Sequence, residues 1–210
     1  MKKLLLFIAI AAAVVIAGCS ASEEPASAPL VASIATFNGS ANGLSTFSYT
    51  EADGSTVELT AAWNAPEELP VGARVLIYYR AEQYGVSAEI ALLSVARIPS
   101  GKVEVASRSE IPASADVSQA RAWRSGEWIN FGAVITFSGN LRELSMIVDS
   151  ATLSDSIAQA YVVVLPATDA VASADRQLYA SWNADSILKI PELRAINVNL
   201  PGSQAVLIRK

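Results

Sequence analysis

The sequence predicts an all-β protein with two domains. Short runs rich in β-branched and aromatic residues recur along the chain, and turn signals that contain Gly, Pro, Asn or Asp separate them. Only one short stretch, near the C-terminus, has the pattern of a helix. Many short strands with frequent turns are typical of sandwiches and barrels, so these observations favour that class.

The first half of the chain contains the first group of predicted strands. Asp53-Gly54 lies between the first two, and such a pair is a strong hairpin signal. Pro99-Ser100-Gly101 interrupts the pattern before the last. The predicted strands span Leu44 to Tyr49, Thr56 to Ala62, Arg74 to Arg80, Ala88 to Arg97 and Lys102 to Ala106. About five strands in roughly 75 residues fit a small closed barrel or a sandwich.

A second domain is predicted after a segment without strand character, Ser107 to Asp116. The expected domains are residues 33–108 and residues 116–210. Trp128 to Ser138 alternates well, with Ile129, Phe131, Ala133, Ile135 and Phe137 on one face and Asn130, Gly132, Thr136 and Ser138 on the other. This alternation predicts a half-buried strand.

Further strands and one short helix complete the second half. The strands are predicted at Leu144 to Val148, Tyr161 to Leu165, Leu178 to Asn183, Ile196 to Leu200 and Ala205 to Arg209. The helix is expected at Asp185 to Ile190, with Asp185 as its N-cap and Pro191 at its end.

The N-terminus has the three-part layout of a secretory signal. Lys2 and Lys3 provide a charged start, Leu4 to Ala17 is an apolar run, and Ile16-Ala17-Gly18-Cys19 forms a lipobox. The apolar run is shorter than the about 20 residues of a membrane-spanning helix. The sequence therefore predicts a signal peptide at residues 1–18 and lipidation of Cys19, the only cysteine of the chain. The alternatives are an ordinary secretory signal and an uncleaved N-terminal helix.

Residues 19–32 are expected to form a flexible tether, because they are rich in Ser, Ala and Pro. About three acyl chains of the palmitate type on Cys19 would hold the mature protein stably on a membrane. Ser20, rather than Asp, after the cysteine favours the outer membrane of a Gram-negative cell. Glu23-Glu24 is either a short signal for export to the cell surface or part of a solvated tether, so the periplasmic face and the cell surface both stay open.

Composition excludes several classes of function. The chain has no histidine, so Ser-His-Asp and Cys-His sites are ruled out, and zinc and non-haem iron sites lose their most common ligand. Removal of residues 1–18 takes two lysines and leaves 13 Lys and Arg against 20 Asp and Glu, which does not suit nucleic-acid binding. We therefore expect no metal, no cofactor and no nucleic-acid partner. A hydrolase with a pair of carboxylates stays open as the enzymatic alternative.

The strand predicted at Arg74 to Arg80 offers a candidate ligand-binding face. Alternation places Arg74, Tyr78 and Arg80 on the outward side and Tyr79 in the core. Aromatic and basic side chains on a barrel face suit an oligosaccharide or a peptide. When an arginine lies beside a tyrosine on an exposed strand face, cross-strand packing is the more common explanation.

Two tryptophans form a second candidate site. Trp123 and Trp128 lie on the two sides of Ser125-Gly126. They either clamp a sugar ring or pack at the entrance of the sandwich core, and the second interpretation is preferred because large aromatic side chains seldom stay exposed.

Three segments of the chain resemble the NigD-like lipoproteins of anaerobic Gram-negative bacteria. They are Asp53-Gly54-Ser55-Thr56 with the strand Val71 to Tyr79, then Trp123 to Phe131, and Tyr179-Ala180-Ser181-Trp182. The resemblance covers nearly the whole mature chain and implies an OB-like barrel followed by a β-sandwich. Two histidines that the family often has, one of them near the position of Leu165-Pro166, are absent here. The role of the family is uncharacterised, and an operon association with bacteriocin production suggests immunity or export.

The leading expectation is a non-enzymatic, lipid-anchored envelope protein that binds a partner protein or a glycan. The alternatives are a bacteriocin-associated immunity or export lipoprotein and a carboxylate-dependent envelope hydrolase. Two carboxyl groups about 5 to 9.5 Å apart in a cleft would favour the hydrolase, and an aromatic groove without acids would favour binding.

Overall fold

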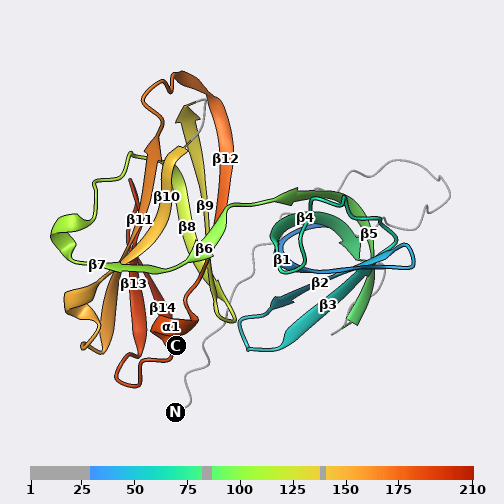
Figure 1. Cartoon of the computed structure of the whole chain (residues 1–210), viewed down its shortest axis with the longest axis horizontal. Coiled ribbons are helices and arrows are strands. Elements are labelled where there is room, and N and C mark those ends of the chain that lie inside the picture. Colours follow the sequence, from blue (N-terminus) through green and yellow to red (C-terminus); the bar gives the residue numbers. More distant parts are fainter. Residues whose placement is uncertain (1–28, 82–86, 138–140) are drawn as a thin grey trace, which may run out of the picture.

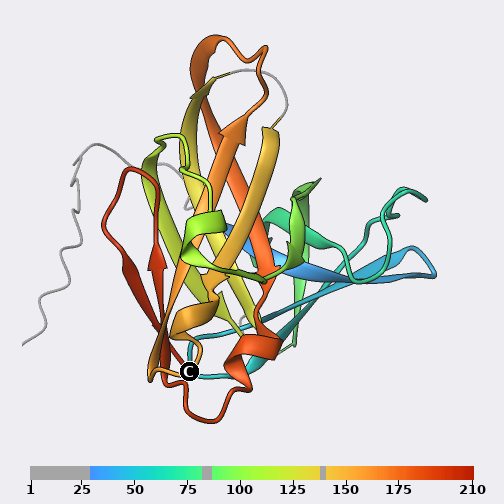
Figure 2. The same ribbon diagram turned by 60° about the vertical axis from the view of Figure 1, so that its left-hand side comes forward.

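The computed structural model describes residues 29–81, 87–137 and 141–210. In this part of the chain nearly all regular structure is strand, and α1 (Asp185–Leu188) is the one α-helix. The predicted all-β class is therefore confirmed. Figures 1 and 2 show a barrel that lies beside a sandwich.

The first domain is a closed barrel with an OB-like strand order. Its strands are β1 (Leu30–Ala41), β2 (Leu44–Thr50), β3 (Thr56–Ala61), β4 (Arg74–Ala81) and β5 (Ser87–Arg97). They follow the order β1-β2-β3-β5-β4, in which β3 runs parallel to β5. Phe37, Phe47 and Ile77 lie in its core, and Tyr79 lies there as predicted.

The strand β1 is absent from the sequence-based prediction. It pairs with β2 on one side and with β4 on the other, and so closes the barrel. The expectation that the tether extends through residue 32 is wrong at its end, because Leu30 already pairs with Arg80. Ser, Ala and Thr dilute the strand pattern of this segment, so its pairing partners decide its conformation.

The second domain is a sandwich of two sheets. One sheet has the order β14-β13-β11-β10-β7, and the other has the order β6-β12-β9-β8. The strands are β6 (Ser100–Lys102), β7 (Glu104–Ala106), β8 (Ser118–Ser125), β9 (Trp128–Phe137), β10 (Leu141–Asp149), β11 (Ile157–Pro166), β12 (Ala172–Asn183), β13 (Ala195–Asn199) and β14 (Val206–Arg209). Two 3₁₀ turns, η1 (Arg108–Glu110) and η2 (Ser150–Thr152), connect them. Phe131, Met146 and Trp182 are buried in the core between the sheets.

The boundary between the domains lies near Pro99, earlier than the expected residue 108. The strand predicted at Lys102 to Ala106 consists of β6 and β7, and both belong to the sandwich rather than to the barrel. β6 runs parallel to β12 in one sheet, β7 runs parallel to β10 in the other, and Val103 is buried between them. Such short strands carry no periodic pattern, so only their tertiary partners reveal the sheet to which they belong.

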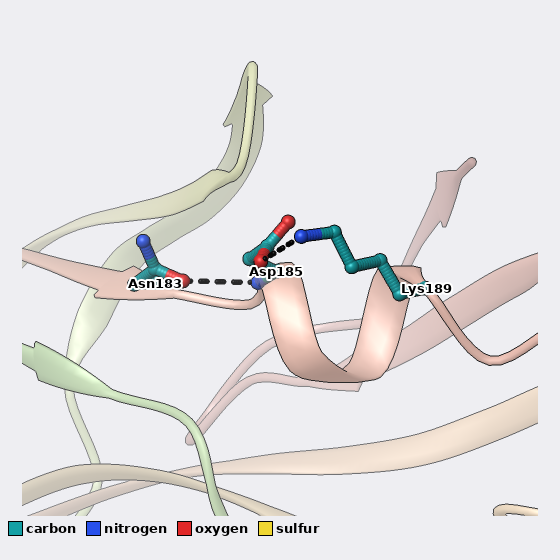
Figure 3. Close-up of polar contacts among 3 residues, drawn as sticks. All are labelled: Asn183, Asp185 and Lys189. Atoms are coloured by element: carbon teal, nitrogen blue, oxygen red, sulfur yellow. Dashed lines mark hydrogen bonds and ion pairs between the residues drawn. The ribbon is translucent and has the colours of Figure 1, made fainter.

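The helix α1 forms where it was predicted, but its cap differs. Asp185 is its first residue, and Ala184 occupies the N-cap position that the sequence assigned to Asp185. The side chain of Asn183 satisfies the helix start, because its Oδ1 accepts a hydrogen bond from Asp185 N at 3.0 Å (Figure 3). Lys189 Nζ donates to Asp185 Oδ2 at 2.7 Å, and this bond raises the pKa of Lys189.

The strand β9 is buried on both faces from Ile129 to Ile135, which corrects the prediction of a half-buried strand over this stretch, whereas Thr136 on the polar face is exposed. Its apolar face lies in the sandwich core as predicted, where Ile129 and Phe131 are each 0 % exposed. On the other face Asn130 is 0 % exposed and Val134 is 4 % exposed. Alternation separates the two faces of a strand, but it does not reveal that Arg74 of the barrel reaches Asn130 on the polar one.

Candidate binding site at the domain junction

One buried arginine joins the two domains. Arg74 begins β4 of the barrel and is 1 % exposed. Its guanidinium donates from Nε to Ser181 Oγ at 3.1 Å, from Nη1 to Thr36 Oγ1 at 2.9 Å and from Nη2 to Asn130 Oδ1 at 3.0 Å. Thr36 belongs to the barrel, whereas Asn130 and Ser181 belong to the sandwich. The arginine is therefore bonded to both domains at once.

Arg74 is buried without a direct ion pair to a described carboxylate. An ion pair joins Lys189 to Asp185 instead, at the helix α1. The ring of Trp128 lies against the Arg74 guanidinium, with its centroid 4.9 Å from Cζ, which is a cation–π contact. Burial lowers the pKa of Arg74 to about 10, and the charge of Glu127 acts in the opposite direction. The guanidinium thus stays protonated at neutral pH, held by neutral oxygens and an aromatic face.

Two of the three acceptors of Arg74 are fixed by the neighbouring strands β9 and β12. Asn130 and Ser181 are paired in register, and Ser181 Oγ donates to Asn130 Oδ1 at 2.8 Å. Asn130 Nδ2 is buried and has no hydrogen-bond partner among the described residues. A buried donor without a partner lowers the stability of the fold. The opposite amide orientation would be worse, because it would turn Nδ2 toward two donors, the guanidinium of Arg74 and the hydroxyl of Ser181. The bond to the arginine therefore decides how the amide points.

A second polar contact joins the turn between β8 and β9 to the barrel. Ser125 Oγ donates to Thr50 O at 2.9 Å and accepts from Thr50 N at 3.1 Å. Gly126 follows with φ +61°, and a Cβ at this position would lie 2.8 Å from Thr50 Oγ1. Glycine is needed here both for the left-handed backbone and for the close approach to the barrel.

An apolar cluster occupies another part of the junction. It contains Ile34, Leu76 and Ile98, which are buried, and Tyr78, Trp123 and Tyr179, which pack against them. The first three come from the barrel side, whereas Trp123 and Tyr179 project from β8 and β12 of the sandwich. Polar contacts around Arg74 and apolar contacts around Leu76 thus hold the domains together.

The predicted ligand face of the barrel is largely the surface that meets the sandwich. Arg74 and Tyr78 lie on the outward side of β4, as alternation predicts, but the second domain packs on them. Arg80 is half-buried at the end of the same strand, where it pairs with Leu30 of β1. The prediction of an open ligand-binding face at Arg74 is therefore wrong, because this arginine binds the chain's own sandwich.

The two candidate tryptophans also lie at the junction. Neither is part of the sandwich core cluster, so the preferred prediction that they pack at the entrance of that core is wrong. Trp128 contacts Arg74, whereas Trp123 packs beside Leu76 in the apolar cluster. They line different hollows and do not form a single clamp around one ligand.

The hollow beside Trp123 is the best candidate site, and we call it the aromatic hollow. Its volume is about 350 Å³, and it is lined by Trp123, Tyr179, Arg121, Ala32, Ile34, Leu76 and Ala122. Both domains contribute to it. No acid is among these described lining residues.

Arg121 and Tyr179 were not singled out from the sequence, and the fold brings them together over Gly132. Both residues are register partners of this glycine of β9. Arg121 Nη2 donates to Tyr179 Oη at 3.2 Å, and Arg121 Cζ lies 5.8 Å from the ring centroids of both Tyr179 and Trp123. A Cβ on Gly132 would lie 3.2 Å from Arg121 Nε and 3.2 Å from Tyr179 Cε1. The glycine inside an alternating strand was the one available signal, since such a residue often marks a close approach.

A second hollow, the charged cleft, shares Trp123 and Ala122 with the first. It has a volume of about 620 Å³ and lies between the barrel residues 50–54 and the C-terminal residues 206–210. The barrel wall carries two acids and the sandwich wall carries three cations, which are Glu51, Asp53, Arg124, Arg209 and Lys210. The two walls thus differ in sign.

Asp53 of the charged cleft lacks the environment of a general acid. Asp53 accepts hydrogen bonds from Ser55 N at 2.9 Å and from Ser55 Oγ at 2.7 Å, and these bonds lower its pKa. A glycosidase acid requires a pKa that is raised by an apolar environment. Asp53 and Glu51 are both exposed, and the bonds from Ser55 give Asp53 a structural role in the turn between β2 and β3.

Residues 29–81, 87–137 and 141–210 have neither a cluster of metal ligands nor a helix suited to cross a membrane. They contain no group of three or more Cys, Asp or Glu side chains placed to hold a metal ion. None of their helices has the length and the apolar character needed to cross a bilayer. Cys19, the predicted lipidation site, lies outside the described residues.

Several solved structures share this architecture at low sequence identity. A DUF1344 protein of unknown function from Bacteroides vulgatus aligns with a TM-score of 0.63 at 16% identity, over 87% of this chain and 90% of its own. A protein of Bacteroides fragilis that is provisionally described as a lipoprotein aligns with a TM-score of 0.56 at 14% identity, over 86% and 98%. A NigD-like immunity protein of Bacteroides caccae aligns with a TM-score of 0.58 at 13% identity, over 84% and 90%. This chain has the NigD-like fold.

The NigD-like fold includes both domains, because each alignment covers more than four fifths of both chains. The barrel followed by a sandwich that the sequence resemblance implied is thereby confirmed. No family model and no curated protein matches the sequence. At these identities the likeness to the NigD-like structures concerns the fold, so the role of the chain is argued from its own junction.

Proposed function

We propose that this NigD-like chain is a lipid-anchored, non-enzymatic binding protein of the bacterial cell envelope. Its binding site is the aromatic hollow, and its partner is a glycan or a protein segment that enters this hollow. The observation that carries the proposal is the placement of Trp123 and Tyr179 around a hollow whose described lining contains no acid. The lipobox at Cys19 supports the envelope location, with the outer membrane favoured.

The junction supports a site that is formed before a partner arrives. Arg74 bonds to both domains, and Ser125 bonds to Thr50 across the same interface. A preorganised site loses less conformational entropy on binding than a mobile one. The volume of about 350 Å³ also falls in the range of about 300 to 1,000 Å³ that is typical of small-molecule sites.

The predicted anchor supports a partner at the membrane surface. Ala32 lines the aromatic hollow and comes thirteen residues after Cys19. A chain of this length spans at most about 47 Å even when it is extended. A lipid on Cys19 would therefore keep the hollow within roughly 50 Å of the bilayer.

The chemistry of the charged cleft supports a role without catalysis. The chain has no histidine, and its two acids in this cleft, Glu51 and Asp53, are exposed. The pKa of Asp53 is lowered, whereas a hydrolase of the carboxylate type needs one raised pKa. These observations favour binding over the hydrolase alternative.

The matched tyrosines Tyr179 and Tyr161 test the proposal. Both are half-buried on long strands, and both lie under a guanidinium, but Tyr161 belongs to β11 of the other sheet and does not line the aromatic hollow. The mature chain with Cys19→Ser is immobilised on a support and incubated with an envelope extract, from which it should retain a partner. Tyr179→Ala should reduce that retention about fivefold or more, because an aromatic contact is lost.

Quantitative mass spectrometry of the retained material gives the measurement. Tyr161→Ala should retain the partner as the parent chain does. Equal retention by Tyr179→Ala and the parent chain, or retention of nothing above an empty support, would rule out the aromatic hollow as the binding site.

A second candidate role is immunity against a toxin. It is favoured by the description of one fold relative, the Bacteroides caccae protein, as a NigD-like immunity protein. Under this hypothesis the aromatic hollow binds a segment of the toxin at the membrane. Deletion of the gene should then sensitise the cell to a toxin encoded beside it, and unchanged sensitivity would remove this role.

A further inference from the structure

The lining of the aromatic hollow carries a single sign of charge. Arg121 is the one charged residue among its described lining residues, and this side chain is exposed. The mature chain as a whole has an excess of acids, with 20 Asp and Glu against 13 Lys and Arg. The aromatic hollow is therefore a local positive site on an acidic protein, and electrostatics favour an anionic group there.

The guanidinium of Arg121 has donors to offer to such a group. A guanidinium carries five N–H donors in a planar fork. Tyr179 Oη accepts one of them, and the guanidinium makes no other hydrogen bond within the described part of the chain. The fork matches the two oxygens of a carboxylate, which it binds through paired hydrogen bonds.

The rest of the lining suits a flat ring with apolar faces. Trp123 and Tyr179 supply aromatic rings, and the small side chains Ala32 and Ala122 leave space beside them. The volume of about 350 Å³ admits a compact group rather than a protein surface, which needs about 800 Å² on each partner. A pyranose ring has C–H faces that pack on aromatic rings and a polar rim that accepts hydrogen bonds.

We propose that the aromatic hollow binds an acidic saccharide. One pyranose unit lies against Trp123 and Tyr179, and its carboxylate accepts the paired hydrogen bonds of Arg121. Because Trp123 and Ala122 line both hollows, the next unit of an oligosaccharide extends toward the charged cleft. This proposal rests on the proposed binding function and names the chemical class of its partner.

Trigalacturonate and its fully methyl-esterified form test the proposal, because esterification removes the negative charge of each unit and adds only one methyl group. Calorimetric titration of the mature chain with Cys19→Ser should show binding of the acid at least about tenfold tighter than binding of the ester. Arg121→Gln should weaken binding of the acid by about tenfold to a hundredfold and leave the ester unchanged. Arg121→Lys should fall between the two, because it keeps the charge and loses the fork.

Arg108→Gln is the matched control. Arg108 lies over Tyr161 with its Cζ 4.3 Å from the ring centroid, so it repeats the arginine–tyrosine contact away from the hollow. This variant should bind the acid as the parent chain does. Equal affinity for acid and ester would overturn the acidic class, and so would absence of binding to both.

In either of those cases the proposed function is judged separately by the envelope retention experiment with Tyr179→Ala. A partner retained through Tyr179 while trigalacturonate fails to bind would leave the binding role in place and remove the acidic saccharide. Binding of the acid that survives Arg121→Gln would place the carboxylate elsewhere and also overturn the assignment.

Discussion

Arg74 illustrates, at the scale of single residues, how a cation is buried without a direct ion pair to a described carboxylate. Its partners are a threonine, an asparagine and a serine, together with the face of Trp128. A guanidinium suits this environment because it is weakly hydrated, is planar and donates in several fixed directions. The same side chain that suggested a ligand site from the sequence thus holds the two domains together.

Replacement of Arg74 should destabilise the whole chain. Arg74→Ala should lower the free energy of unfolding by about 3 kcal/mol, because packing is lost and buried acceptors lose their donor. Arg74→Lys should lower the free energy of unfolding somewhat less, because lysine keeps the charge but lacks the planar fork that reaches all three acceptors. Urea unfolding followed by tryptophan fluorescence measures both values. A loss under about 1 kcal/mol for Arg74→Ala would mean that this arginine contributes little to the junction.

The turn between β8 and β9 is informative at the scale of elements. It carries Ser125 and Gly126 to Thr50 of the barrel, so a local hairpin turn also serves as a contact between domains. The strand β8 before it was not predicted, because Ser118-Gln119-Ala120-Arg121-Ala122 lacks β-branched residues. Its pairing with β9 decides its conformation, and it brings Arg121 and Trp123 to the aromatic hollow.

Substitution of two glycines distinguishes the stability lost to a strained backbone from the stability lost to a steric clash. Gly126 has φ +61° and Gly54 has φ +88°, but only at Gly126 would a Cβ meet another atom within 4 Å, namely Thr50 Oγ1 at 2.8 Å. Gly54→Ala should cost about 1 to 2 kcal/mol, because an L-residue is strained in this region. Gly126→Ala should cost at least about 1 kcal/mol more, from the clash with the barrel. Equal losses in thermal or urea unfolding would show that the turn moves away from Thr50 without penalty.

At the scale of the whole molecule, the boundary between the domains lies near Pro99, earlier in the chain than the residue 108 expected from the sequence. β6 and β7 follow the barrel directly in the chain, yet each pairs with one sheet of the sandwich. Figure 1 shows this segment leaving the barrel and crossing to the sandwich. The crossing connects the two sheets through Val103, which is buried in the sandwich core.

Two fragments test the boundary. A fragment of residues 99–210 should unfold cooperatively, because it contains every strand of the sandwich. A fragment of residues 109–210 should be less stable by at least about 2 kcal/mol, since it lacks both short strands and the buried side chain of Val103. Circular dichroism during thermal unfolding compares them, and equal stability would return the boundary to residue 108.

The sequence was informative wherever a local pattern carries the structure. The alternation of β9 predicted its core face, the run around Tyr79 predicted β4, and Asp53-Gly54 predicted the turn between β2 and β3. It was uninformative for β1, β6 and β8, whose conformations depend on partners far away in the chain. The same holds for the candidate site. Trp123 was named as a site residue from the sequence, whereas Arg121 and Tyr179 meet only because β8 and β12 both pair with β9, on the two sides of Gly132.

By itself, then, the sequence determined the all-β class and the division into two domains, and it predicted a lipid anchor at Cys19, because these follow from periodicity, turn residues and a linear motif. The barrel followed by a sandwich was implied by the resemblance to the NigD-like lipoproteins. The tertiary structure alone decided what covers each outward face. Alternation turns Arg74 and Tyr78 out of the barrel and Asn130 out of the sandwich, and the same geometry would serve an open surface or a buried one. The docking of one domain on the other made these residues an interface and left Trp123, Tyr179 and Arg121 around the hollow beside it.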